Sequence, residues 1–123
     1  MLIDSNIIIY AAQPRYEDLR QFIMDHVPAV SAISYVEVLG YHQLTEQERR
    51  HFDAFFKASL VLPLSQKVLE QAVRLRQRRR MSLGDALVAG TALAFNRTLV
   101  TRNIDDFKGI KKLSVLNPFE TDS

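Results

Sequence analysis

Residues 82–103, SLGDALVAGTALAFNRTLVTRN, contain the clearest secondary-structure signal in the chain. Residues 82–96 are apolar almost all round and rich in alanine and glycine, which predicts a buried, closely packed helix. Residues 98–101 form a short apolar run typical of a buried strand, and a polar cluster follows it directly. A buried helix leading into a buried strand favours βαβ units and a mostly parallel sheet.

The rest of the chain repeats this alternation of short apolar runs with longer periodic ones. Strands are expected at residues 1–3, 28–33, 60–64 and 113–116, the last at an edge of the sheet. Helices are expected at residues 16–26, 34–43, 45–59 and 65–79, and residues 7–12 fit either a strand or a helix. The sequence therefore predicts an α/β fold, a small and mostly parallel sheet flanked by helices.

Two of these helices have apolar residues at helical spacing. Phe52, Phe55 and Phe56 lie on one face of the helix at residues 45–59, which indicates a core face or a dimer face. In the helix at residues 65–79, the residues expected to face inward are Val68, Leu69, Ala72, Val73 and Leu75.

Length and composition limit the domain organisation and the chemistry. The 123 residues suit one domain over residues 1–123, with a core at about 1–117 and a short C-terminal tail. The chain has no cysteine, which excludes disulfides, thiolate metal sites and a cysteine nucleophile. No basic stretch precedes the first apolar run, and the apolar residues 86–95 are too few to span a bilayer, so we expect a cytoplasmic protein without a membrane segment.

Three acids occupy positions where a carboxylate is costly. Asp4 lies between two apolar runs, near the expected core, and Ser5 and Asn6 could donate hydrogen bonds to it. Glu37 and Asp85 come three residues after Ser34 and Ser82, as in a capping box. For Glu37 alone, a helix cap and a functional acid are about equally good interpretations.

The joint placement of the acids says more than each acid does alone. One follows the first strand, two open helices, and the polar cluster of Thr101, Asn103 and Asp106 follows a later strand, although a plain turn would have the same composition. In a parallel sheet these points lie at one edge, where open α/β sheets bind ligands. Clustered oxygen ligands suit a hard divalent ion such as Mg²⁺. The three histidines, on separate segments, are expected on the surface: His26, His42 and His51.

The basic residues gather in one short stretch. The formal net charge is only +2 and the pI about 9.1, which permits but does not require a polyanionic partner. Cations at a helix C-terminus are favoured by the helix dipole, and this is the simpler interpretation. They could also bind RNA phosphates, and the candidates are Arg76, Arg78, Arg79 and Arg80 of the run at 74–80, together with Arg102.

Four segments in order resemble the PIN-domain family, and in particular VapC-type toxins of bacterial toxin–antitoxin pairs. They are MLIDSNIIIYA, SAISYVEVLG, SLGDALVAGTALAF and LVTRNIDDF, and together they span nearly the whole chain. The resemblance implies an endoribonuclease that depends on Mg²⁺ or Mn²⁺ and leaves 5′-phosphate and 3′-hydroxyl ends. It also implies a VapB-type antitoxin as partner and a homodimer. Because a groove of four acids attracts a basic side chain, we expect an arginine or lysine of the antitoxin to bind there.

The resemblance also assigns roles to individual residues. Asp4, Glu37 and Asp85 match the catalytic, metal-binding acids, with Asp4 and Asp85 the most direct ligands and Glu37 free to orient a water molecule. Asn103 stands where many members of the family have a fourth acid, so Asp106 is expected to substitute in part. Ser5, Asn6 and Thr101 are expected to be supporting hydrogen-bond donors.

Two other classes of function compete with this interpretation. One is a PIN domain that binds RNA or protein without catalysis, which Asn103 leaves open. The other is a phospho-acceptor signalling module, which would need an aspartate ending a central strand. The expected third strand, LVLPL, contains none.

Overall fold

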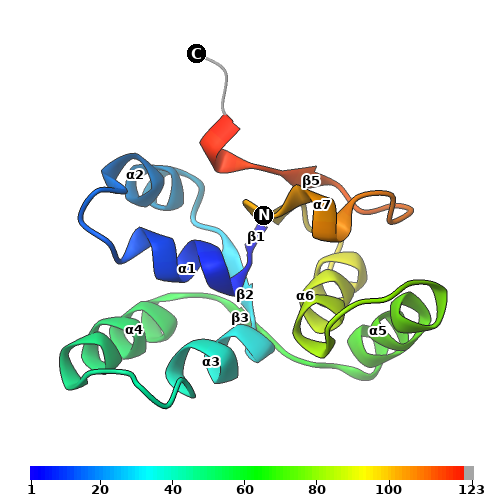
Figure 1. The fold of residues 1–123 in the computed structure, drawn as a ribbon, viewed down its shortest axis with the longest axis horizontal. Helices are drawn as coiled ribbons and strands as arrows, with labels where there is room; N and C mark the ends of the chain where they lie inside the picture. Colours follow the sequence, from blue (N-terminus) through cyan, green and yellow to red (C-terminus); the bar gives the residue numbers. More distant parts are fainter. Residues whose placement is uncertain (121–123) are drawn as a thin grey trace.

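The centre of the molecule is a five-stranded parallel sheet, seen in a computed structural model that describes residues 1–120 (Figure 1). Its strand order is β3-β2-β1-β4-β5, and each neighbouring pair is parallel. The strands are β1 (Leu2–Ile3), β2 (Ala29–Ser31), β3 (Val61–Leu62), β4 (Leu99–Val100) and β5 (Val115–Leu116). The predicted sheet is confirmed, including the edge position of its last strand.

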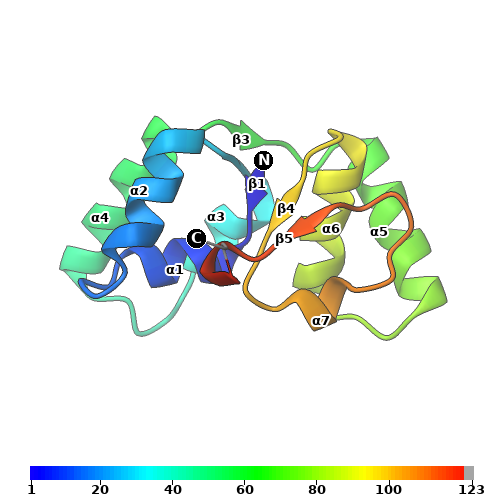
Figure 2. The same cartoon turned by 90° about the horizontal axis from the view of Figure 1, so that it is seen from above.

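Helices cover both faces of this sheet. In Figures 1 and 2, α1, α2 and α4 lie on one side of the strands and α5, α6 and α7 on the other. The elements are α1 (Ser5–Ala11), α2 (Glu17–His26), α3 (Ala32–Leu39), α4 (Glu46–Ala58), α5 (Gln66–Arg78), α6 (Leu83–Ala94), α7 (Ile104–Phe107) and the 3₁₀ turn η1 (Pro118–Glu120). The ambiguous residues 7–12 therefore belong to a helix. Over residues 1–120, no helix combines the length and the apolar character that crossing a membrane requires.

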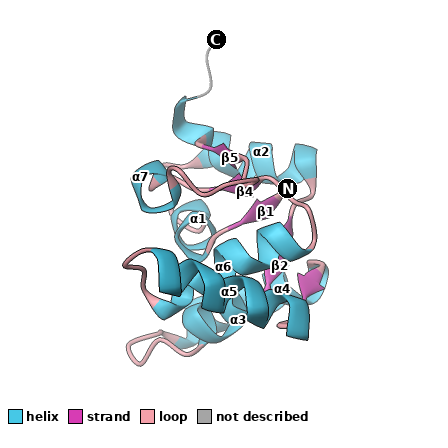
Figure 3. Ribbon diagram, turned by 90° about the vertical axis from the view of Figure 1, so that its right-hand side faces the viewer, coloured by secondary structure: helices cyan, strands magenta, loops and turns pink. Residues whose placement is uncertain are grey.

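The register of the strands sorts their side chains into two cores. Leu2 pairs with Ala29 and Leu99, and all three pack against α5, α6 and α7. The next row, in which Ile3 pairs with Val30 and Val100, packs against the helices of the other face. Because side chains alternate along a strand, each short strand serves both layers. Figure 3 looks onto α5 and α6, with strands behind them.

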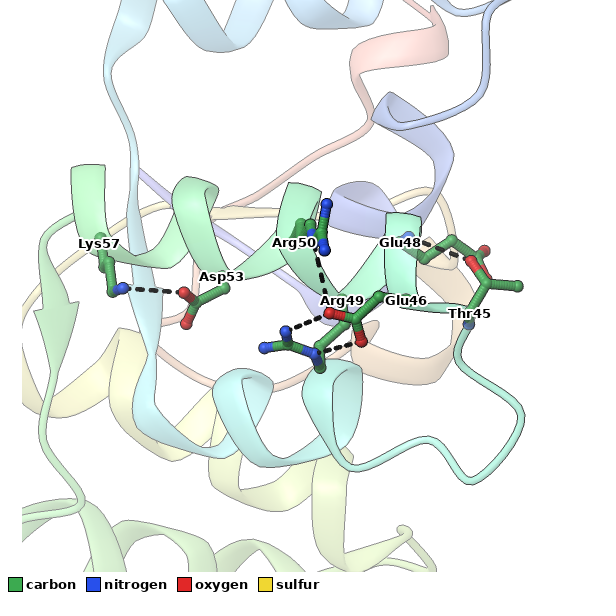
Figure 4. Close-up of polar contacts among 7 residues, drawn as sticks. All are labelled: Thr45, Glu46, Glu48, Arg49, Arg50, Asp53 and Lys57. Carbon is green, nitrogen blue, oxygen red and sulfur yellow. Dashed lines mark hydrogen bonds and ion pairs between the residues drawn. The ribbon is translucent and has the colours of Figure 1, made fainter.

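Helix caps fix where most of the helices begin. Thr45 and Glu48 form a capping box at the start of α4, and ion pairs follow along its surface (Figure 4). Ser65 and Ser82 cap α5 and α6. The predicted cap of α3 is wrong, because Ser31, not Ser34, accepts the hydrogen bond of the first turn, from the Ile33 N–H at 3.3 Å.

The early start of α3 has a tertiary cause. Ser31 ends β2 and its hydroxyl also bonds the buried Thr91 hydroxyl of α6 at 2.8 Å, which holds the cap in place. Ser34 is fully buried one turn into the helix. Glu37 therefore lies in the second turn, too far along for a capping box, so the capping interpretation of this acid is also wrong.

The inward faces of two helices can be compared with their predicted patterns. Phe52 and Phe56 are buried in the core, as predicted. On α5, however, Leu69 and Val73 are 41% and 55% exposed, against the prediction. This helix packs mainly against α6 through a narrow stripe, so residues beside the stripe face solvent.

Packing continues past residue 117, where the sequence suggests a tail. The Phe119 ring meets those of Tyr10 and Tyr16 edge to face, with centroids 5.8 and 5.5 Å apart. The Arg102 guanidinium lies over the Phe119 ring at 4.5 Å and over the Tyr10 ring at 5.2 Å. Residues 121–123 of the expected tail lie outside the described residues.

The contact between α5 and α6 depends on Gly90. A Cβ at this position would lie 2.9 Å from the Val68 carbonyl oxygen and 3.2 Å from the Ala72 nitrogen. We expect Gly90→Ala to lower the free energy of unfolding, measured by urea denaturation, by about 1–3 kcal/mol through overpacking. Helix propensity alone would raise it by about 1 kcal/mol, so a stabilised variant would contradict the close approach.

Candidate active site

Asp4 lies where β1 passes directly into α1. Its backbone N–H bonds the Val100 carbonyl of β4, and its carboxylate caps α1 by accepting from the Ile7 N–H at 2.9 Å. The buried Thr101 hydroxyl, just after β4, also hydrogen-bonds this carboxylate. Asp4 is only 6% exposed, so the sheet holds a carboxylate almost out of water at its carboxyl edge.

Glu37 approaches the same edge from α3. Its Oε1 accepts a hydrogen bond from the Ser5 hydroxyl at 2.7 Å, and the Ser5 and Ser34 hydroxyl oxygens are 2.9 Å apart. Because a hydroxyl has one hydrogen and an ionised carboxylate only accepts, Ser34 donates to Ser5 and Ser5 donates to Glu37. Ser5 was predicted to serve Asp4, and this is wrong: it holds the neighbouring acid instead.

Asp85 completes the set from the first turn of α6. The Asp85 N–H donates to the Ser82 hydroxyl at 3.1 Å, and its side chain is half-buried. The preceding residue, Gly84, lies so close to the Glu37 carboxylate that a Cβ there would clash with Glu37 Oε2. Glu37 thus lies between the residue after Asp4 and the residue before Asp85, which joins the three acids spatially.

The acids perturb one another electrostatically. Burial raises the pKa of Asp4, hydrogen bonds from Thr101 and Ile7 offset part of this, and the charges of Asp85 and Glu37 raise the pKa further. Burial also raises the pKa of Asp85, followed by the charge of Asp106, while the Ser82 hydrogen bond lowers it. Asp4, Glu37 and Asp85 therefore lie near enough to one another for their charges to interact.

The remaining predicted residues divide into those near the acids and those away from them. The charge of Asp106, on α7, raises the pKa of Asp85. Asn103 is exposed at the start of α7, and its backbone N–H donates to Thr101 Oγ1 at 3.1 Å. Asn6 is exposed on α1. Arg102 packs on aromatic rings, as described above. The histidines His26, His42 and His51 are exposed, as expected.

Ser34 and Gly84 are the two site residues that the sequence did not single out. Ser34 looks like a cap in the sequence, and only its burial beside Ser5 shows its place in the hydrogen-bond chain. Gly84 stands next to an acid in SLGD, but glycine near a helix start is common enough to carry no signal.

The donor set has the chemistry of a site for a hard cation. In residues 1–120, no three His, Cys, Asp or Glu side chains are placed to hold one ion together as they stand. Mg²⁺, however, keeps several waters and often takes only one or two carboxylates from the protein. Asp4 is buried and Asp85 is half-buried, and their like charges repel each other, so they are the pair that could hold such an ion.

Residues 1–113 match the model of the PIN domain family. The chain belongs to this family. The resemblance seen in the sequence is thus confirmed over most of the chain.

Individual relatives agree in length and fold. Ribonuclease VapC2 of Rickettsia felis is 29% identical, with 94% of this chain and 96% of the relative covered. A toxin–antitoxin complex from Klebsiella pneumoniae contains a chain that is 28% identical with a TM-score of 0.79, covering 98% of both chains. VapBC2 from Rickettsia felis, solved with a DNA fragment from its promoter, gives 26% identity and a TM-score of 0.78, covering 94% of this chain and 96% of that one.

The raised pKa of Asp4 makes the free energy of unfolding decrease as the pH rises. Between the ordinary aspartate pKa of about 3.9 and the raised native one, the native state binds more protons than the unfolded state, so the free energy of unfolding falls as pH rises. We expect Asp4→Asn, whose amide oxygen can still cap α1, to gain stability over wild type as pH rises from about 4 toward neutral. Chelator-treated proteins compared by urea denaturation test this, and a pH-independent difference would contradict it.

Proposed function

We propose that this PIN domain is a metal-dependent endoribonuclease and the toxin of a VapBC-type toxin–antitoxin pair. The observation that carries the proposal is the buried Asp4 carboxylate, whose charged neighbours Asp85 and Glu37 have the same sign as itself. Such an arrangement is unfavourable in the metal-free protein and favourable around a cation. The names of its relatives, a VapC ribonuclease and toxin–antitoxin complexes, support the nuclease class.

In this proposal each side chain has a separate task. Asp4 and Asp85 would hold Mg²⁺ or Mn²⁺, with Asp106 assisting Asp85 because Asn103 carries no charge. A bound divalent ion supplies a lowered pKa for a coordinated water and stabilises the charge that develops on phosphate oxygens. Thr101 and the Ile7 N–H keep the Asp4 carboxylate oriented.

Glu37 is the acid best placed to act on the nucleophile. The Ser34–Ser5 hydroxyl chain fixes its Oε1, while Gly84 leaves space for its Oε2. Held this way, Glu37 would orient the attacking water and take its proton. Attack on phosphorus, with the bond to the 3′ oxygen breaking and that oxygen taking a proton, leaves a 5′-phosphate and a 3′-hydroxyl.

The same electrostatics suggest how the toxin would be silenced. We propose a VapB-type antitoxin that places an arginine or lysine side chain among Asp4, Glu37 and Asp85, where a cation relieves the repulsion as a metal would. We also expect a homodimer. The alternative of an RNA- or protein-binding domain without catalysis rests on Asn103, the neutral residue where many relatives have a fourth acid.

Removing the charge of Asp4 separates these alternatives. We expect wild type to cleave RNA when Mn²⁺ is added and Asp4→Asn to lose at least about 100-fold of that rate, because a direct ligand should matter no less than an outer-shell residue. Gel analysis of cleaved RNA measures the rates, and circular dichroism verifies that the variant is folded. Equal rates would remove Asp4 from the mechanism, and no cleavage by either protein would favour the binding domain.

A double-mutant cycle can test whether Gly84 acts by leaving space for Glu37. We expect Gly84→Ala to reduce cleavage by about 10-fold or more by displacing Glu37, an effect of the size seen when supporting residues are lost. In a double-mutant cycle, Gly84→Ala should then have little further effect in a Glu37→Ala background. Losses that simply multiply would show that Gly84 acts independently of Glu37.

A further inference from the structure

A second polar feature lies away from the acids, on the α5 side of the molecule. A groove of about 610 Å³ runs between α5, the end of α6 and the loop at residues 109–112. Among residues 1–120 no acidic side chain lines it, and five cations do: Arg74, Arg78, Arg79, Lys111 and Lys112.

These cations come from two distant parts of the chain. Arg74 and Arg78 lie one helical turn apart on α5, about 5–6 Å between Cβ atoms. Lys111 and Lys112 line the same groove from the loop between α7 and β5, the two elements that this loop joins in Figure 1. The ion pairs found in residues 1–120 all lie on α4 (Figure 4), so the groove presents its charge to solvent. Cations repeated along a groove match a polyanion better than a single anion.

The groove and the acidic site meet at α7. Arg79 donates hydrogen bonds to the Lys108 carbonyl at 2.6 Å and to the Asp106 carbonyl at 3.4 Å, which ties the end of α5 to α7. The charge of Asp106, which lies on α7, raises the pKa of Asp85. An RNA strand that leaves the acidic site along α7 would therefore enter the groove.

Electrostatics give a reason for two such regions on a nuclease. The cluster of Asp4, Glu37, Asp85 and Asp106 repels the phosphates that it is meant to cleave. Affinity for a phosphate backbone comes mainly from neutralising cations, and here these lie outside the acidic cluster. Resting on the proposed function, we infer that the groove of Arg74, Arg78, Arg79, Lys111 and Lys112 binds the backbone of the substrate RNA beside the scissile phosphate.

The groove divides the arginine run at residues 74–80 into two groups. Arg78 and Arg79 line the groove, as does Arg74, whereas Arg76 and Arg80 are exposed outside it. The chain therefore offers a matched control, since Arg76 and Arg80 have the same side chain, the same charge and nearly the same position in sequence.

The experiment measures binding without cleavage. In the Asp4→Asn background, fluorescence anisotropy follows a labelled single-stranded oligouridylate over a range of salt concentrations. For Arg74→Ala/Arg78→Ala we expect affinity to fall about 10-fold or more and the salt slope to decrease by about one for each phosphate that is no longer neutralised. Arg76→Ala/Arg80→Ala should change affinity by less than about twofold, because charges that do not touch the strand are screened.

Lys111→Ala extends the test to the other wall of the groove and should weaken binding in the same sense.

The outcomes distinguish a failure of the RNA-binding groove from a failure of the proposed nuclease activity. Equal losses from the two arginine pairs would overturn the inference and indicate net charge alone. Competition by a polyglutamate peptide as strong as that by unlabelled oligouridylate would also overturn it, in favour of an acidic protein partner. If wild type cleaves no RNA but only the groove variants lose binding, the proposed nuclease fails while the groove stands.

Discussion

The structure is organised around one buried negative charge. Asp4 directly follows β1, caps α1 and places its carboxylate at the carboxyl edge of the sheet. The cap and the Thr101 hydrogen bond compensate only part of the burial, since the pKa of Asp4 remains raised. A buried carboxylate whose burial is only partly compensated is unfavourable in the protein alone, and this is the basis of the proposed cation site.

The other acids reach this edge because the sheet register brings their elements together. β1 lies between β2 and β4, so the segments after these three strands converge at one place. Small side chains then set the fine geometry. Ser34 and Ser5 orient Glu37 through hydroxyl hydrogen bonds, and Gly84 allows α6 to approach it. The site therefore depends on four separate segments and on helix packing that tolerates little added volume.

Negative and positive side chains gather in different regions of the molecule, although the net charge is only +2. Carboxylates gather at the edge of the sheet, and cations gather along α5 and the loop after α7. The two regions meet where Arg79 bonds the backbone of α7. A phosphate chain can be attracted by one region and presented to the other, which a uniformly charged surface would not achieve.

Local sequence patterns were enough to predict the α/β class, the parallel sheet, most of the helices and the convergence of Asp4, Glu37 and Asp85. These follow from local periodicity and from the rule that parallel strands end at one edge. Only the tertiary structure decided that Ser31 caps α3, that Ser5 holds Glu37, that Leu69 and Val73 face solvent, and that Arg78 lines a groove while Arg76 does not. Each of these depends on a partner from a distant segment, so local patterns leave more than one outcome open until the segments pack together.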